Sequence, residues 1–188
     1  MKRSIFILLI GSMILAGCAT LNKEECLSGN WRELGMKDGV NGEPANRIKE
    51  HRKACAEHGI QLDEKLYMAG HAEGLREYCQ IDNAFRSGLN GQRYNSVCPL
   101  DIHSLFLRYN DAAYAVYETR QEIKNKHDSI SAAQNQLGNK KTPASSKDDI
   151  RRDIQKLESE LDKLRNDLRD RERRLDKLMA EERQKKRK

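Results

Sequence analysis

The residues of this sequence that could carry acid–base chemistry are one aspartate and two histidines in its first half, Asp38, His51 and His71. A carboxylate beside an imidazole, for example Asp38 beside His71, is a pairing that general acid–base catalysis uses. A hydrolase also needs a nucleophile and donors that stabilise developing negative charge, and no motif supplies them. These three residues define the alternative hypothesis, a hydrolase or metal-dependent enzyme.

A metal site is suggested by His51, Cys55 and His58, whose spacing of four and three residues places them on one face of a helix. No fourth ligand is placed, however, and Cys55 is needed to keep an even number of cysteines for pairing. No Gly-rich loop ends in Lys-Ser or Lys-Thr, as a phosphate-binding loop would. We therefore predict no metal and no cofactor.

The N-terminal segment has the pattern of an export signal. Lys2 and Arg3 precede an apolar run over residues 5–14, which is too short to span a bilayer comfortably. The run ends in Leu15-Ala16-Gly17-Cys18, which resembles the lipobox of bacterial lipoproteins. This resemblance implies a signal peptide over residues 1–17, acylation of Cys18, including palmitate, and a lipidated tether over residues 18–25. Ala19 implies the outer membrane of a Gram-negative cell; an ordinary secretory signal or an uncleaved anchor is the alternative.

Four further cysteines remain in the exported chain: Cys26, Cys55, Cys79 and Cys98. An even number in an oxidising compartment favours two disulfides. Four cysteines allow three pairings, and the sequence does not choose between them. A module of about 75 residues with few large apolar side chains would be marginally stable without such cross-links.

Glycines follow aromatic residues at short spacing in this cysteine-containing region. The sets are Trp31 with Gly35 and Gly39, Tyr67 with Gly70 and Gly74, and Phe85 with Gly88 and Gly91. Glycine inside a helix costs roughly 1 kcal/mol, so we expect a compensating reason. Close packing of helix backbones is the simplest one, and a backbone surface open to a ligand is the alternative. Helices are predicted over residues 44–58 and from a cap at Asp63 to Cys79.

After Pro99 the apolar residues recur at alternating spacings of three and four. The first series is Phe106, Tyr109, Ala113, Val116, Ile123, Ile130 and Leu137, with Arg120, His127 and Gln134 at the weaker positions. The second series is Ile150, Ile154, Leu157, Leu161, Leu164, Leu168, Leu175 and Leu178, interrupted only by Arg171. This pattern predicts a coiled coil with arms over residues 100–138 and 148–188 and a polar loop over residues 139–147.

Arms of similar length favour an antiparallel hairpin within one monomer, and a homo-oligomer held by the second arm is the alternative. In the hairpin, the basic end of the chain, Lys185 to Lys188, returns to the cysteine-containing module.

The net charge of +6 is concentrated at the C-terminus, where residues 171–188 carry nine basic and four acidic side chains. These basic residues could complement the dipole of a helix end, or they could bind an envelope protein or anionic lipid headgroups. Because the rest of the exported chain is close to neutral, we predict no nucleic-acid binding. Charged residues make up 34% of the chain, which is too polar for one compact core and indicates an elongated part.

These features together resemble the uncharacterised bacterial lipoprotein family called domain of unknown function 2799, over about residues 15 to 120. Besides the lipobox, the resemblance lies in Glu25-Cys26, Trp31, Gly35-x2-Asp38-Gly39, His51-x2-Ala54-Cys55, Tyr67-x2-Gly70-His71-x2-Gly74-Leu75-x2-Tyr78-Cys79, Gly88-x2-Gly91-x2-Tyr94 and Val97-Cys98-Pro99. It implies a cell-envelope lipoprotein, and it brings no catalytic residues.

We therefore expect an all-α fold: a small disulfide-stapled helical module over residues 26–99, followed by a long antiparallel coiled-coil hairpin. The predicted function is that of a non-enzymatic structural or adaptor lipoprotein. It would be anchored to the outer membrane through Cys18, would face the periplasm, and would bind partners through its module or its coiled coil.

Overall fold

The computed structural model describes residues 20–187, so the predicted signal peptide, Cys18 and Ala19 lie outside the described residues. The described chain is helical and contains no strand, which confirms the all-α prediction. Its elements are α1 (Lys23–Ser28), α2 (Trp31–Val40), the 3₁₀ turn η1 (Ala45–Arg47), α3 (Ile48–Ala56), α4 (Glu64–Tyr78), α5 (Ile81–Leu89), α6 (Leu100–Gly138) and α7 (Ala144–Lys185). Within residues 20–187 no helix is both long enough and apolar enough to cross a bilayer.

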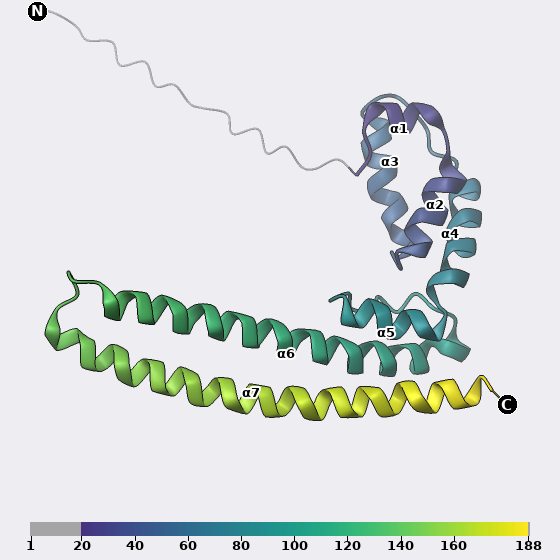
Figure 1. The fold of residues 1–188 in the computed structure, drawn as a ribbon. Coiled ribbons are helices and arrows are strands. Elements are labelled where there is room, and N and C mark those ends of the chain that lie inside the picture. The colour runs from purple at the N-terminus through teal and green to yellow at the C-terminus, as the bar shows by residue number, and fades with distance from the viewer. Residues whose placement is uncertain (1–19, 188) are drawn as a thin grey trace, which may run out of the picture.

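The molecule has the shape of an L (Figure 1). Helices α1 to α4 form the upright limb, and α6 and α7 lie side by side as a long antiparallel hairpin that forms the other limb. Helix α5 lies along the base of α6, at the corner. The predicted hairpin is thus confirmed. Its C-terminal end returns to this corner, where Lys186 pairs with Asp82 of α5 at 2.7 Å.

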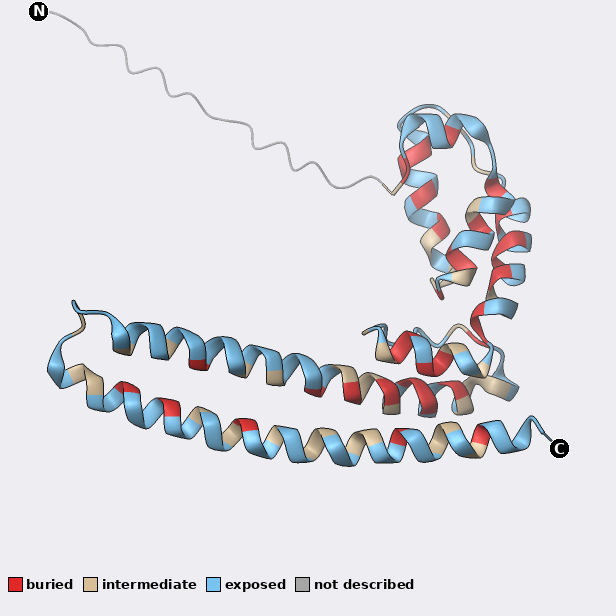
Figure 2. Cartoon of the chain, viewed as in Figure 1, coloured by how far each residue is buried: buried red, intermediate tan, exposed pale blue. Residues whose placement is uncertain are grey.

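Three separate apolar cores hold this shape (Figure 2). The first, inside the upright limb, contains Leu21, Cys26, Trp31, Ile48, Ala54, Cys55 and Tyr67. The second, at the corner, contains Tyr78, Cys79, Ala84, Phe85, Tyr94, Cys98, Phe106, Tyr109, Ala113, Val116 and Leu175. The third, in the outer hairpin, contains Ile130, Ile150, Ile154 and Leu161. The second core joins residues from both sides of Pro99, so the module and the hairpin share a core there.

Residues 20–25, which we expected to form part of a tether, belong to the folded module. Leu21 is buried in the first core. Asn22 caps α1 with a reciprocal pair of hydrogen bonds, because its side chain accepts from the backbone N–H of Glu25 and the Glu25 carboxylate accepts from the backbone N–H of Asn22. The folded module therefore includes residues that we expected to form a tether.

The helices predicted on either side of Gly59 are present with small changes. Residues 44–58 form η1 followed by α3, which ends at Ala56, and Gly59 turns the chain with a positive φ of 70°. Asp63 caps α4 as predicted, since its carboxylate accepts the backbone N–H of Leu66 at 3.0 Å.

The glycines of α2 and α4 bring the two helix backbones into direct contact. A Cβ atom on Gly35 would lie 2.0 Å from the carbonyl oxygen of Tyr67, and one on Gly70 would lie 1.8 Å from that of Arg32. Gly39 and Gly74 are equally crowded by the opposite backbone. Close packing is therefore the reason for these four glycines, and the alternative of a backbone surface open to a ligand is wrong for them.

The two glycines of the third set, Gly88 and Gly91, have different structural roles. Gly88 of α5 packs against α6, where an added Cβ would lie 2.5 Å from the carbonyl oxygen of Asn110. Gly91 lies beyond the end of α5 in a turn with a φ of +82°, against the ring of Tyr117. Only the first glycine of this set thus serves helix packing, and the second is required by the turn.

The predicted apolar series of α6 is buried or half-buried throughout, but the three predicted weaker positions are not part of its inward face. Thr119 is buried and Lys126 and Ala133 are half-buried, whereas Arg120, His127 and Gln134 are exposed. Two successive steps of three residues, from Ala113 to Thr119, shift the inward positions by one residue. The predicted weaker positions were therefore wrong, and in α7 the predicted series is buried or half-buried throughout, Arg171 included.

Candidate functional site

Asp38, His51 and Tyr67 form a buried polar cluster inside the upright limb, one residue from each of α2, α3 and α4. Asp38 Oδ2 accepts two hydrogen bonds, one from the Tyr67 hydroxyl at 2.7 Å and one from His51 Nε2 at 2.8 Å. All three residues are buried. This cluster is the place where the structure gathers the acid–base candidates of the sequence.

Neighbouring constraints position each member of the cluster. Asp38 precedes Gly39, one of the glycines through which α2 contacts α4. His51 lies one helical turn before Cys55, whose disulfide to Cys26 fixes α3 to α1. Tyr67 contributes its backbone to the same helix crossing. The side chains therefore meet because the backbones around them are held tightly.

The second nitrogen of His51 binds the beginning of the folded chain. His51 Nδ1 lies 2.9 Å from the Thr20 hydroxyl oxygen. Since Nε2 faces the Asp38 carboxylate and donates its proton there, Nδ1 is the nitrogen that pairs with the Thr20 hydroxyl. His51 thus links Thr20, two residues after Cys18, to the centre of the module.

Electrostatics fix the protonation states of Asp38 and Tyr67. Burial alone would raise the pKa of Asp38, but the hydrogen bonds from His51 and Tyr67, together with the charges of His51 and Arg47, lower its pKa below the ordinary 3.8. Arg47 Nε lies 3.7 Å from Asp38 Oδ1. Burial and the adjacent carboxylate raise the pKa of Tyr67 far above its ordinary value of 10. Asp38 is therefore an anion at neutral pH and Tyr67 remains a donor.

His71 lies beside this cluster without joining it. Its ring stacks on that of Tyr67 with 6.0 Å between ring centroids, and its Nε2 donates to the carbonyl oxygen of Glu43 at 2.8 Å. The three candidate residues thus surround one tyrosine, but the hypothetical acid–base pair of Asp38 with His71 is not formed. The partners that sequence reasoning missed are Thr20, Arg47 and Tyr67.

The hydrogen bonds of this cluster hold segments of the module together. Hydroxyl, imidazole and carboxylate are aligned as in an activated nucleophile, but the imidazole and the carboxylate are both buried. Four segments that are distant in sequence meet at Asp38 and His51, and each of their hydrogen bonds would be lost if the segments separated. This arrangement supports a structural role for the three residues.

The hypothetical metal site is not formed. Cys55 is in a disulfide and His58 is exposed, so the thiolate that a metal would need is consumed. Among residues 20–187 no group of three or more His, Cys, Asp and Glu side chains is arranged to hold a metal ion.

The two disulfides that the sequence predicted are present, and the structure selects one of the three pairings. Cys26 is bonded to Cys55, and Cys79 is bonded to Cys98. The first disulfide lies in the core of the upright limb and the second in the core of the corner. Each of these two cores therefore has its own cross-link.

A second buried polar group lies at the base of the hairpin. Glu182 of α7 is buried and accepts hydrogen bonds from the Tyr109 hydroxyl at 3.0 Å and from Lys185 Nζ at 3.2 Å. Glu182 follows Leu178 by four residues, so it continues the apolar series of α7 with a charged residue. That spacing was the signal that could have identified it.

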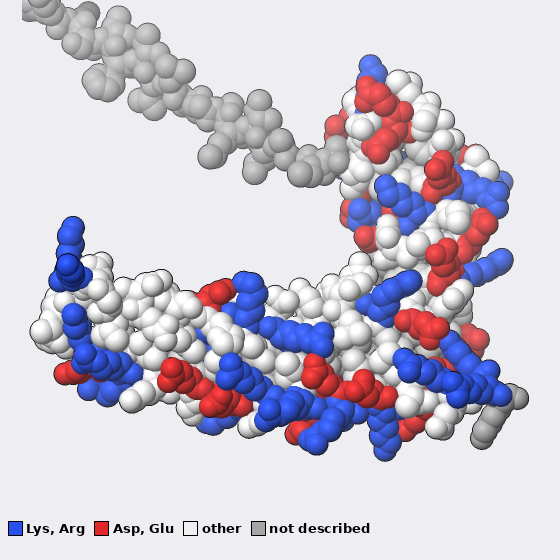
Figure 3. All heavy atoms as spheres, in the orientation of Figure 1, with Lys and Arg blue, Asp and Glu red and all other residues white. Residues whose placement is uncertain are grey.

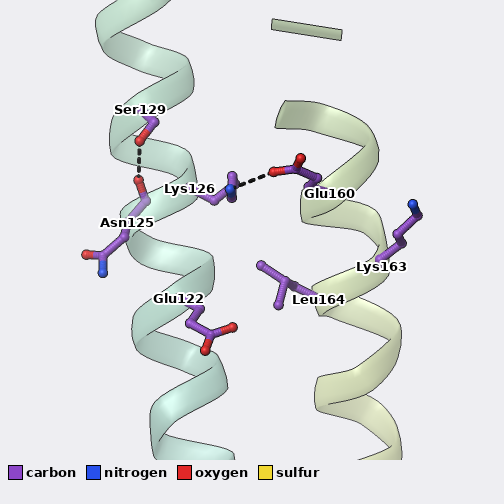
Figure 4. Close-up of a pocket in the computed structure, with 7 residues that line it drawn as sticks. All are labelled: Glu122, Asn125, Lys126, Ser129, Glu160, Lys163 and Leu164. Atoms are coloured by element: carbon purple, nitrogen blue, oxygen red, sulfur yellow. Dashed lines mark hydrogen bonds and ion pairs between the residues drawn. The ribbon is translucent and has the colours of Figure 1, made fainter. Parts of the chain in front are cut away.

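An open groove of about 490 Å³ runs between the two hairpin helices. In Figure 4 the Lys126 side chain reaches across the groove to Glu160, with 2.7 Å between nitrogen and oxygen. Leu164 lies beside this ion pair and points from α7 towards α6. The groove lies in the hairpin, away from Asp38 and His51, so the buried cluster does not line it.

Fold and site define a class: an all-helical module, cross-linked by two disulfides, with a long helical hairpin attached. The family described as "Protein of unknown function (DUF2799)" matches residues 30–115, which run from the start of α2 into α6. An uncharacterised protein of Escherichia coli (strain K12), YfiL, is 31% identical over 96 residues, which are 50% of this chain and 74% of the relative. No solved structure matches the chain. The protein belongs to the DUF2799 family, and α7 lies outside the matched residues.

Proposed function

We propose that the protein is a non-enzymatic lipoprotein of the cell envelope, anchored to the outer membrane through acylated Cys18, with the hairpin as an arm that spaces or recruits partners in the periplasm. The observation that carries this proposal is the direct attachment of the hairpin to a disulfide-stapled module that includes Thr20. Such a module would hold the arm at a defined place relative to the anchor.

The buried cluster supports a non-enzymatic role. An envelope hydrolase using Asp38, His51 and His71 would need these side chains to reach a substrate, but all three are buried and His71 binds a backbone carbonyl. The proposal assigns the three residues to stability. Activity against envelope ester or glycan substrates that is lost in His51→Gln, while the variant remains folded, would instead support the enzyme alternative.

Membrane extraction tests the anchor. We expect the protein to remain with the membrane fraction in high salt and to be released by detergent, because acyl chains are held by hydrophobic burial. Cys18→Ser, which leaves the four disulfide cysteines intact, should be lost from the membrane fraction. Salt-extractable wild-type protein, or unchanged membrane attachment of Cys18→Ser, would contradict the anchor.

The arm is tested separately by partner recovery. Leu161 and Ile154 lie in the core of the outer hairpin, so replacing them and Leu168 with Lys should separate α7 from α6 there. We expect the variant to keep both disulfides and to lose envelope partners that cross-link to the wild type. Unchanged partner recovery would move the binding surface to the module. Light scattering distinguishes the monomer that we favour from a homo-oligomer.

A further inference from the structure

The far end of the hairpin carries three lysines, Lys140 and Lys141 in the loop and Lys147 in the first turn of α7. No acidic residue occurs from residue 129 to residue 147, a stretch that contains Lys140, Lys141 and Lys147. Asp148 and Asp149 directly follow Lys147 but have other partners, since Asp148 pairs with Arg151 at 2.6 Å and Asp149 pairs with Arg152. On the other side of the loop, Asp128 pairs with Lys124 at 2.8 Å.

None of the three lysines forms an ion pair within the part of the chain that the structure describes. Figure 3 shows blue side chains gathered at this end of the hairpin.

The basic C-terminal end has a different environment. Lys185 contacts both Glu182 and the Tyr109 hydroxyl, and Lys186 pairs with Asp82 of α5. Along the rest of α7, basic and acidic side chains alternate and several pair within the helix. The end of the chain that is richest in basic residues thus uses part of its charge internally, whereas the loop does not.

Hydrogen bonds within the loop fix the place of its lysines. The backbone N–H of Lys141 donates to Asn139 Oδ1 at 2.9 Å, and the Thr142 hydroxyl donates to the carbonyl oxygen of Gln136 at 2.7 Å. Helix α7 then begins after Pro143 with no acidic residue in its first turn. Lys140 and Lys141 are exposed, and Lys147, in the first turn of α7, is half-buried. Two of the three positive charges therefore lie at a fixed turn, and the third lies at the start of the following helix.

We propose that residues 139–147, the loop and the first turn of α7, are a docking surface for a bilayer that contains anionic phospholipid headgroups. The ammonium groups of three lysines at this end of the hairpin match an extended surface of phosphates, to which each basic residue adds roughly fivefold in affinity. The inference rests on the proposed envelope function and adds a contact far from the anchor, because the 39 residues of α6 are about 58 Å long at 1.5 Å per residue.

Vesicle sedimentation tests the proposal with the oxidised chain lacking residues 1–18, which carries no acyl group. Vesicles of phosphatidylcholine with phosphatidylglycerol are compared with vesicles of phosphatidylcholine alone. We expect binding only to the anionic vesicles, weakened roughly 100-fold when Lys140, Lys141 and Lys147 are all changed to Gln. The matched control changes Lys156, Lys163 and Lys177 of α7 to Gln, which removes the same charge from another part of the hairpin.

Equal weakening by the two triple variants would show an effect of net charge alone and would overturn the proposal. Binding of the chain to purified peptidoglycan but not to anionic vesicles would also overturn it, in favour of a polymer partner. The outcomes separate this inference from the proposed anchor. A protein that is acylated on Cys18 in cells but does not bind the vesicles loses only the loop as a docking surface, and the reverse result contradicts only the anchor.

Discussion

The upright limb and the outer hairpin are both made of helices packed on helices. Backbone atoms make the contacts in the limb, and side chains make them in the hairpin. In the limb, α2 and α4 touch through backbone atoms at four glycines, beside a disulfide and a buried charged cluster. In the outer hairpin, α6 and α7 touch through branched aliphatic side chains spaced by three and four residues. Stability in the limb is therefore concentrated in a few positions, whereas in the hairpin it is distributed along the seam.

This difference bears on function. A contact made by backbones and cross-links allows little change of residue, and residues 30–115, which contain the glycine crossing, are the part that the family shares. The seam of α7 needs only aliphatic residues at the right spacing, and it lies outside those residues. The crossing of α2 and α4 thus lies within the part that the family shares, and α7 lies outside it.

The largest effect should come from adding one methyl group at the glycine crossing. Gly70→Ala places a Cβ against the Arg32 carbonyl oxygen, which cannot move without separating α2 from α4. We expect it to lower the free energy of unfolding by about 3 kcal/mol or more, measured by urea denaturation. Gly138→Ala, where a Cβ would have nothing within 4 Å, is the control and should be close to neutral. Equal effects of the two changes would mean that α2 and α4 do not cross through their backbones.

Removing one disulfide at a time tests whether the limb and the corner are stabilised independently. Changing Cys26 and Cys55 to Ser, or Cys79 and Cys98 to Ser, should each cost about 3 kcal/mol, because each bond closes a loop of similar length. Hydrogen exchange should increase first in α1 and α3 for the first variant, and in α5 and the start of α6 for the second. The same regions losing protection in both variants would show that the two cores are not separate.

Tyr67→Phe removes one donor to the buried Asp38 carboxylate and should cost about 2 kcal/mol at pH 7. The lowered pKa of Asp38 stabilises the fold fully above the ordinary value of 3.8, and this stabilisation is lost as the pH falls below it towards the folded-state pKa. Since the variant loses part of that lowering, its difference from wild type should shrink in acid. Urea denaturation at several pH values measures this, with Tyr117→Phe as control; a difference independent of pH would contradict the hydrogen bond to an ionised Asp38.

The smallest effect is expected at the base of the hairpin. Glu182→Gln keeps an oxygen that can accept from Tyr109 but removes the charge that attracts Lys185. We expect a loss of about 1 kcal/mol, detected by thermal unfolding. Glu181→Gln changes the neighbouring residue in the same way and should be neutral. A larger loss at position 181 than at position 182 would indicate a different register of α7.

Features that depend on spacing within one helix were predicted from the sequence more fully than contacts between segments. The α7 seam and the Asp63 cap follow from spacings within one helix, and the sequence contained both. The shift of the α6 seam at Thr119 was missed because it depends on the facing helix. The pairing of Cys26 with Cys55, and the contact of Gly35 with α4, depend on which segments meet, which spacing does not reveal.

The polar cluster shows the same limit. The sequence singled out Asp38 and His51 by residue type, and the structure brings them within 2.8 Å. It could not indicate Tyr67, which had the pattern of a packing aromatic, or Thr20, which had been assigned to a tether. Asp38 and His51, whose residue types suggested catalysis, connect Thr20 to the centre of the module through hydrogen bonds.

The intact mass of the protein extracted from membranes tests the proposed anchor most directly. We predict a chain that begins at Cys18, carries acyl chains on that residue, and does not change in mass with thiol-blocking reagents, because Cys26, Cys55, Cys79 and Cys98 are all in disulfides. A chain that begins elsewhere, or one with an unmodified Cys18 thiol, would contradict a lipid-anchored protein.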